Sequence, residues 1–190
     1  MANLRLACPL ALAAALLLAG CDPQASIPQG IQVYFSPRGG ATEAVVKAMG
    51  QATNSVLVQA YSFTSAPIAK ALVEAHRRGV TVQVILDDSQ RTEKYSEADF
   101  LKHNGIPTLI DARHAIAHNK IMIIDAAVII TGSFNFTKAA EEHNAENLLV
   151  INDPVLAGQY IENWHAHEQH SQPYDRESRP AERTGRAKRK

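Results

Sequence analysis

The sequence has little cysteine or tryptophan and shows no internal repeat. It contains 2 cysteines and 1 tryptophan in 190 residues. Cys8 lies in an N-terminal apolar stretch, so Cys21 would be the only cysteine of a processed chain, and no intrachain disulfide could form. The sequence also lacks a P-loop, a G-x-S-x-G nucleophile motif and a closely spaced cysteine pair, which excludes the chemistries that depend on those motifs. Any active site must therefore be built from other residues.

The N-terminal segment is typical of an export signal. Its apolar stretch, residues 9–18, is too short to span a bilayer comfortably as a helix. The sequence Leu18-Ala19-Gly20-Cys21 resembles a lipobox, so we expect residues 1–20 to be a lipoprotein-type signal peptide and Cys21 to be lipidated. Asp22 resembles the inner-membrane retention signal of enterobacterial lipoproteins. We expect an exported, periplasmic protein anchored to the inner membrane; the alternative is an ordinary secretory signal and a soluble periplasmic protein.

Charge divides the remaining chain into an acidic part and a basic tail. Residues 22–170 carry 11 basic and 16 acidic side chains, whereas residues 171–190 carry 7 basic and 3 acidic ones. The tail has almost no large apolar residues, so we expect residues 171–190 to be disordered. It could contact phosphates of nucleic acid or acidic lipid headgroups, or be a solvated end without a role. The acidic part argues against a broad nucleic-acid surface.

Apolar segments alternate with helical patterns between a linker, residues 21–30, and the tail. This order predicts one domain, residues 31–170, with the fold class α/β: an α/β/α sandwich around a central mixed sheet. The expected strands are residues 31–35, 55–63, 80–86, 108–110, 120–124, 128–131 and 146–151, and the expected helices are residues 41–52, 66–78, 95–102 and 154–167.

His118, Lys120 and Asp125 form the pattern H-x-K-x-x-x-x-D. A histidine can attack phosphorus as a nucleophile, and a neighbouring lysine can neutralise charge on phosphoryl oxygens. Residues 121–124 are all apolar, which indicates a strand buried on both faces. Side chains two residues apart in a strand point to the same side, so we expect His118 and Lys120 to face one site. The alternative for His118 is a buried, hydrogen-bonded histidine without a catalytic role.

A second motif, Gly132-Ser133-Phe134-Asn135, ends the next apolar run. We expect Lys120 and Asn135 to bind non-bridging phosphate oxygens, one as a charge and one as an amide donor. Ser133 could share that site or make a local backbone hydrogen bond instead. We expect Gly132 to be structural, as the residue that permits a turn and lets the backbone approach a phosphate.

Asp125 is a weaker candidate for catalysis than its place in the motif suggests. It lies seven residues after His118, which in a strand is about 23 Å away and on the opposite face. We expect Asp125 to be structural and to cap the turn at residues 125–127.

These motifs together resemble the phospholipase D superfamily, and specifically its small bacterial endonucleases with one motif copy per chain. The resemblance runs from about Gln32 to about Trp164. It also includes Tyr61-Ser62-Phe63-Thr64, Arg78-Gly79-Val80, Val84-Ile85-Leu86-Asp87 and Glu146-Asn147.

The resemblance implies that two subunits contribute different catalytic groups to one site. His118 of one subunit would attack phosphorus and form a phosphohistidine, and His118 of the other would protonate the leaving group. Glu146 would orient the histidine ring; its alternative is a surface charge at the start of a strand. Because the chain has one motif copy and the mechanism needs two histidines, we expect a homodimer with its site on the twofold axis.

No metal or cofactor is expected. His165, His167 and His170 could suggest a metal cluster, but the neighbouring sequence offers no acidic or cysteine partner at ligand spacing. We interpret them as residues at a helix end, where cationic groups are favoured. His114 and His143, which flank the motif segments, could line a substrate groove.

The leading functional hypothesis is an exported, metal-independent phosphodiesterase that cuts DNA, and also RNA, with little sequence preference. The first alternative is a phospholipase D that hydrolyses phospholipid headgroups. The second is a phosphate-binding envelope lipoprotein without catalytic activity, against which the complete set of motif residues argues. The motif is shared by both enzymatic branches, so it separates their substrates only weakly.

Overall fold

The computed structural model describes residues 30–175. Within them the chain forms a mixed eight-stranded sheet in the order β1-β7-β6-β5-β2-β3-β4-β8. The strands are β1 (Ile31–Ser36), β2 (Ser55–Ala60), β3 (Thr81–Asp87), β4 (Thr108–Asp111), β5 (Lys120–Ile124), β6 (Val128–Gly132), β7 (Glu146–Asn152) and β8 (Gln172–Pro173). The helices are α1 (Ala41–Gln51), α2 (Ala66–Arg77), α3 (Ala98–His103), α4 (Lys138–Glu142) and α5 (Pro154–Glu168), with a 3-10 turn η1 (Asp88–Arg91).

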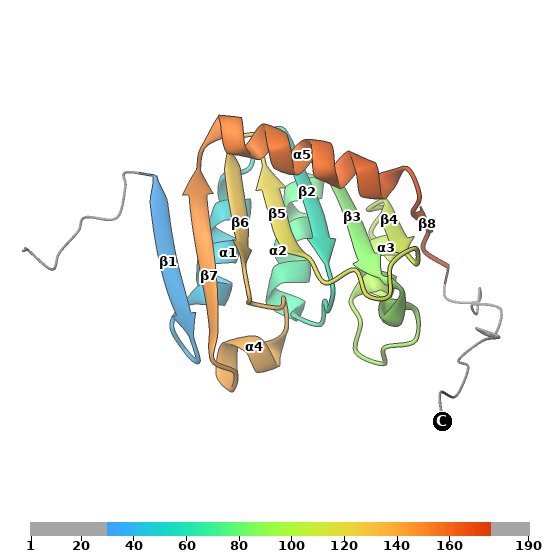
Figure 1. Ribbon diagram of the computed structural model, residues 1–190, viewed down its shortest axis with the longest axis horizontal. Helices are drawn as coiled ribbons and strands as arrows, with labels where there is room; N and C mark the ends of the chain where they lie inside the picture. The colour runs from blue at the N-terminus through green and yellow to red at the C-terminus, as the bar shows by residue number, and fades with distance from the viewer. Residues whose placement is uncertain (1–29, 176–190) are drawn as a thin grey trace, which may run out of the picture.

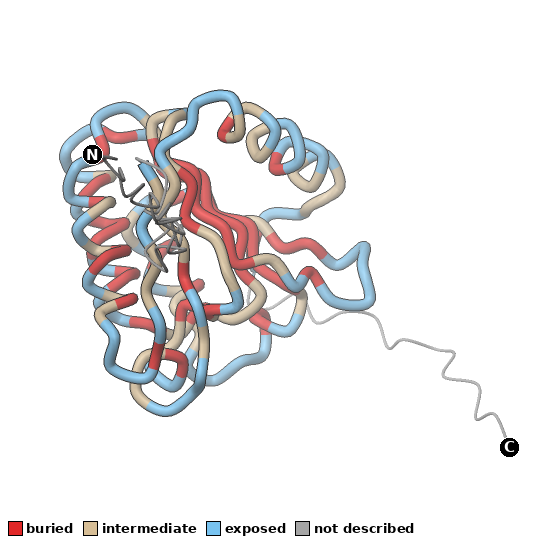
Figure 2. The backbone as a smooth tube through the Cα atoms, turned by 60° about the vertical axis from the view of Figure 1, so that its left-hand side comes forward, coloured by how far each residue is buried: buried red, intermediate tan, exposed pale blue. Residues whose placement is uncertain are grey.

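Helices cover both faces of this sheet. In Figure 1, α5 crosses the face toward the viewer, and α1 and α2 lie behind the strands. Figure 2 shows that the central strands between these layers are buried. The larger core lies on the side of α1, α2 and α3, and a smaller core lies under α5. Trp164 fastens α5 to the sheet, because its indole N–H donates to the Val58 carbonyl oxygen at 2.9 Å. The predicted α/β/α sandwich with a mixed sheet is therefore confirmed.

One end of the sheet gathers the motif segments. Strands β1, β2, β3, β4 and β6 run in one direction, and β5, β7 and β8 run in the other. The carboxyl ends of the first group therefore lie beside the starts of β5 and β7. Ligands of open α/β sheets bind at this kind of end, outside the carboxyl ends of the strands. His118, Lys120, Gly132 and Glu146 all fall there.

The structure differs from the predicted domain boundary at residue 170. Strand β8 pairs antiparallel with β4. Tyr174 is buried, and its hydroxyl donates to Asp99 at 2.9 Å. Our prediction that the disordered tail begins at residue 171 was wrong, because this aromatic ring and the exposed edge of β4 hold the chain in place. Two short elements, η1 and α4, were also not predicted.

The export signal, Cys21 and residues 176–190 lie outside the described residues. Among residues 30–175, no helix has both the length and the apolar character needed to cross a membrane.

Candidate active site

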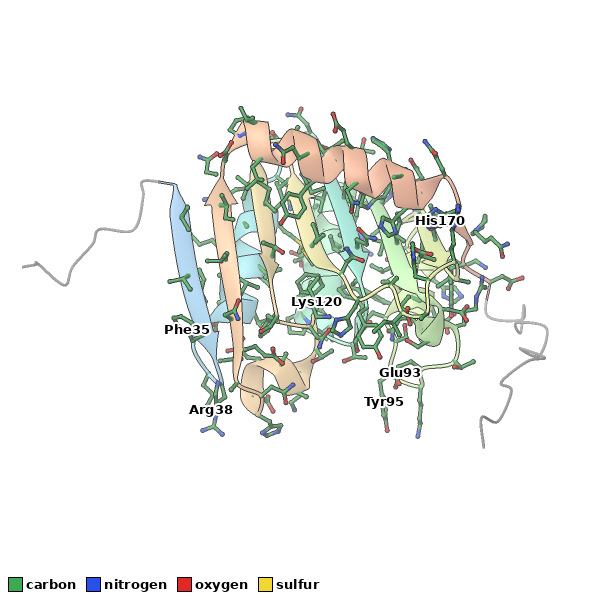
Figure 3. All side chains as sticks on the ribbon, in the orientation of Figure 1. Phe35, Arg38, Glu93, Tyr95, Lys120 and His170 are labelled. Atoms are coloured by element: carbon green, nitrogen blue, oxygen red, sulfur yellow. The ribbon has the colours of Figure 1, made fainter. Side chains whose placement is uncertain are left out.

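His118 and Lys120 lie beside one aromatic ring at the start of β5. The rings of His118 and Tyr61 meet edge to face with their centroids 4.6 Å apart. The Lys120 ammonium lies 5.1 Å from the centre of the same Tyr61 ring and donates to the His118 carbonyl oxygen at 2.8 Å. His118 itself is exposed, whereas Lys120 is buried. The structure thus brings the two motif residues to one place, as their spacing predicted; Figure 3 labels Lys120 there.

The electrostatic environment of Lys120 has two opposing parts. Burial lowers the pKa of its ammonium from the ordinary value of 10.5, while Glu146 and Asp87 act to raise it. A partly dehydrated ammonium interacts more strongly with a phosphoryl oxygen than one in bulk water, because the local dielectric is lower. Lys120 is therefore placed to attract an anion to the ring of His118.

Ser133 and Glu146 form a hydrogen-bonded pair. The Ser133 hydroxyl donates to Glu146 at 2.6 Å and accepts from the backbone N–H of Asn147 at 3.0 Å. Asn144 also donates to Glu146, at 3.1 Å. Since a serine has one hydroxyl proton, this arrangement uses the donor that we had expected to bind phosphate. Ser133 here holds Glu146 in position.

Glu146 does not contact the histidine of its own chain. Within the described residues no hydrogen bond joins Glu146 and His118, whereas the charge of this carboxylate acts on Lys120. The predicted orientation of the histidine ring by Glu146 is therefore not present inside one subunit. It stays a prediction for an assembled site.

The surroundings of Gly132 and Asn135 in the second motif are close-packed at one residue and buried and polar at the other. Gly132 has φ 148°, and a Cβ there would lie 2.3 Å from the Asn147 carbonyl oxygen. The close approach that requires glycine is thus to the backbone of β7, which agrees with the structural role that we expected for Gly132. The side-chain oxygen of Asn135 is buried and has no hydrogen-bond partner among the described residues. Such orphaned polar groups are rare in native structures and are common at functional sites.

Asp125 is structural, as predicted, but its partners are different from those expected. Its carboxylate accepts from the backbone N–H groups of Thr53, Asn54 and Ser55 at 2.7–2.9 Å. It therefore caps the chain segment that enters β2, not its own turn. Burial acts to raise the pKa of Asp125, but these backbone hydrogen bonds outweigh it and hold the pKa below the ordinary value.

Asp87 positions the segment before His118, a role that we did not predict. It ends β3, and its carboxylate accepts from the backbone N–H of Ala117 at 2.6 Å and from that of Ser89 at 2.9 Å. The signal was available, because an acidic residue directly after a buried strand at the active end of a sheet is a candidate for a site. Its partner lies 30 residues away in the sequence and could not be inferred from spacing.

The C-terminal histidines are not isolated at a helix end. His167 and His170 lie with His114 around the carboxylate of Asp111, whereas His165 pairs with Glu168 at 2.9 Å. Our statement that no acidic partner is available was wrong, because β4 brings Asp111 to α5 across the fold. His114 belongs to this cluster.

Comparison with known proteins identifies the family. The protein-family model described as "Cardiolipin synthase, PLD-like domain" matches residues 45–167. The chain belongs to the phospholipase D superfamily. With its complete motif it is a phosphodiesterase of that superfamily.

Relatives of this phospholipase D superfamily member carry two kinds of name. A Rickettsia conorii protein named phospholipase D is 42% identical over 134 residues, which are 70% of this chain and 67% of that protein. A human protein named mitochondrial cardiolipin hydrolase is 29% identical over 150 residues, which are 79% of this chain and 60% of that protein.

Solved structures share the fold. The structure of Nuc from Salmonella typhimurium, titled a phospholipase D family member, is 41% identical with a TM-score of 0.73, covering 76% of this chain and 97% of that one. NucT from Helicobacter pylori, at 24% identity and a TM-score of 0.71, covers 76% of this chain and 98% of that one and supports the fold alone.

Proposed function

We propose that this protein hydrolyses phosphodiester bonds of nucleic acid, DNA and also RNA, with little sequence preference and without a catalytic metal. The observation that carries the proposal is the exposed ring of His118 against Tyr61, with the ammonium of Lys120 on the same ring. An accessible imidazole provides a nucleophile, and the adjacent buried cation stabilises the charge on the phosphoryl group that it attacks.

The reaction has two balanced steps. In the first, a ring nitrogen of His118 forms a bond to phosphorus while the bond from phosphorus to the leaving oxygen breaks. The leaving oxygen takes a proton from the protonated His118 of a second copy. In the second step, that neutral imidazole takes a proton from water, whose oxygen bonds to phosphorus as the phosphorus–nitrogen bond breaks. The products are an alcohol and a phosphate monoester, and both histidines return to their starting states.

Charge stabilisation comes from the side chains around His118. Lys120 and the side-chain amide of Asn135 would donate to the non-bridging oxygens. Glu146, held by Ser133 and Asn144, would stabilise the imidazolium of the second copy, because it makes no hydrogen bond to its own His118. These groups perform the tasks that a metal ion performs in other phosphodiesterases.

A homodimer follows from the number of histidines that the chemistry uses. Each chain contributes one motif copy, so a second His118 must come from a second copy of the chain. The apolar side chain of Ile116, two residues before His118, is 53% exposed. A twofold contact at this end of the sheet would cover it and complete the site.

The position of the site favours a long substrate over an enclosed one. A cleft of about 500 Å³ lies beside α1 and β6, and of the motif residues only Asp125 lines it. The exposed His118 instead lies at the end of the sheet where the second copy would dock, so a polymer backbone would pass between the two copies. The resemblance to single-motif endonucleases supports the same substrate.

Phospholipid is the second candidate substrate. It is favoured by the names of the relatives, phospholipase D and mitochondrial cardiolipin hydrolase. We propose export to the periplasm with lipid anchoring at Cys21, which would also place the site near a membrane surface. The shared motif chemistry serves either substrate.

One assay separates these substrates. Purified protein is incubated with plasmid DNA, with phosphatidylcholine vesicles and with cardiolipin vesicles, each with excess EDTA and each beside His118→Ala. We expect the wild-type protein to nick and linearise DNA even with EDTA present. We expect His118→Ala to have lost this activity. Headgroup release without DNA cleavage would replace the first function by the second. Activity lost with EDTA and restored by a divalent ion would overturn the mechanism for both.

A further inference from the structure

Four potential metal ligands meet away from the catalytic motif. Asp111 ends β4, His114 follows it in the loop toward β5, and His167 and His170 come from the end of α5 and the turn after it. One ligand atom from each of them lies within 4.8 Å of the others. Figure 3 labels His170 near the end of α5, apart from Lys120.

The imidazoles converge on one carboxylate oxygen. Asp111 Oδ2 lies 2.7 Å from His167 Nδ1, 3.2 Å from His170 Nε2 and 3.8 Å from His114 Nε2. The Asp111 side chain is fully buried, and its other oxygen accepts from the backbone N–H of Arg113 at 3.0 Å. His170 Nε2 is buried and lies at ion-pair distance from Asp111 Oδ2, but the angles at this contact are poor for a hydrogen bond. Three imidazole nitrogens therefore gather around one buried carboxylate oxygen.

The donor set suits zinc. Zinc binds histidine nitrogen and aspartate oxygen at about 2.0–2.2 Å in a tetrahedron, so neighbouring donor atoms lie about 3.3–3.4 Å apart. The separations from Asp111 Oδ2 bracket that value, and the separations within the whole group reach up to 4.8 Å, so the four side chains would draw closer together around an ion.

We propose that Asp111, His114, His167 and His170 form a structural zinc site that fastens the loop before His118 to the end of α5. Four protein ligands fill the tetrahedron and leave no position for a substrate, which is the arrangement of structural sites and not of catalytic ones. This site is independent of the phosphodiesterase proposal, whose reacting groups it does not contain.

The consequence for the fold is control of the loop at residues 112–117. At its far end, Asp87 already holds the backbone of Ala117. At its near end, Asp111 pairs with Asp87 across β3 and β4, and His114 lies within the loop. His114 is 45% exposed, so the middle of the loop has little packing of its own. A zinc ion on His114 would immobilise this segment against α5, between two points that the sheet fixes.

The first test measures zinc binding. The full chain is stripped of metal, dialysed and titrated with Zn²⁺ by calorimetry near neutral pH, with Mg²⁺ as the control ion. We expect one Zn²⁺ per chain, a higher Tm and no response to Mg²⁺, which prefers oxygen ligands. Co²⁺ should give the visible absorption of a tetrahedral site.

Variants assign the site. His167→Ala and the more conservative His170→Gln should each lose at least about 100-fold in zinc affinity, since even loss of an outer partner costs 10–100-fold. His165→Ala is the matched control, because His165 lies on the same turn of α5 but pairs with Glu168. Circular dichroism establishes that each variant is folded. Equal zinc affinity in wild type and both cluster variants, or an equal loss in His165→Ala, overturns the site.

A second measurement tests the role of the site. Hydrogen–deuterium exchange of residues 112–117 should slow on zinc addition in wild type and in His165→Ala, but not in His167→Ala. Zinc binding that leaves the exchange of this loop unchanged would overturn the fastening role. Neither measurement depends on the substrate or on catalytic activity, so failure here is distinct from failure of the proposed reaction.

Discussion

At the scale of single residues, the site combines a buried cation with an exposed imidazole. Lys120 is held behind His118 by its hydrogen bond to the His118 carbonyl oxygen and by the Tyr61 ring. The spacing of the two residues predicted only that they share one site. The contacts with Tyr61 and with the His118 carbonyl oxygen were not predicted, and β5 begins at Lys120, so His118 precedes the strand. The hydrogen bond from Ser133 to Glu146 was not predictable in the same way, since it depends on how β6 meets β7.

Replacement of His118 by alanine should abolish turnover and leave the fold intact. An exposed side chain contributes little to stability, whereas loss of a nucleophile costs many powers of ten in rate. His143→Ala is the matched control, because His143 is an exposed histidine beside Glu142 in the same region of the chain. Both variants are compared by DNA cleavage and by Tm. More than about one per cent residual activity in His118→Ala would mean that the nucleophile is another residue.

The charge of Lys120 should be lost at a lower pH than that of an ordinary lysine. Burial lowers its pKa from 10.5, so the ammonium loses its proton as pH rises through a value below that of an ordinary lysine. An NMR titration of labelled lysine, assigned with Lys120→Arg, measures the midpoint. In Glu146→Gln the midpoint should move lower still, because Glu146 raises this pKa. A midpoint at or above 10.5 would contradict the dehydrated environment that we assign to Lys120.

At the scale of elements, the connections between strands carry both the motif and its support. Asp125 joins the β5–β6 turn to the entry of β2 through three backbone N–H groups. The sequence showed that Asp125 could not reach His118, since a strand places the two far apart. It could not show which loop would lie opposite, because the neighbouring strand, β2, lies about 70 residues earlier.

Asp125→Ala should destabilise the protein by about 1–3 kcal/mol, because it leaves backbone donors without their acceptor. The pKa of Asp125 is depressed in the folded state, so its contribution is complete above the ordinary value of 3.8 and is lost as pH falls through the folded pKa. The difference in unfolding free energy between wild type and variant, measured by urea at several pH values, should therefore shrink in acid. Activity per folded molecule should stay at the wild-type level. A variant that is stable but inactive would indicate that Asp125 has a catalytic role.

The elements with a local sequence pattern could be predicted, whereas those that depend on distant contacts could not. Apolar runs such as β5 and the helix between Ser65 and Gly79 were predictable, because their periods and breakers are local. Strand β8 is only two residues long, and no periodicity can indicate it. The cluster around Asp111 was missed for a related reason. His167 lies 56 residues from Asp111, and only the pairing of β4 within the sheet and the crossing of α5 bring them together.

At the scale of the whole molecule, the proposed reaction needs a proton donor, a second His118, that one chain does not supply. The sheet places His118 at one end, and the reaction that we propose uses two motif histidines. Within the described residues, Glu146 finds no histidine of its own chain to orient. A second copy facing the same end would supply the proton donor and give Glu146 a ring to contact.

Activity should therefore depend on the dimer and not on the single chain. On dilution, specific activity should fall with the fraction of dimer measured by analytical ultracentrifugation, because a monomer lacks the second His118. Adding excess His118→Ala to a fixed amount of wild type should also lower activity, since wild-type chains are drawn into mixed dimers with a single histidine. The same excess of His143→Ala should not lower activity, because mixed dimers with this variant still contain two His118 side chains. A fully active monomer, or mixed dimers with the activity of wild type, would show that one His118 performs both steps.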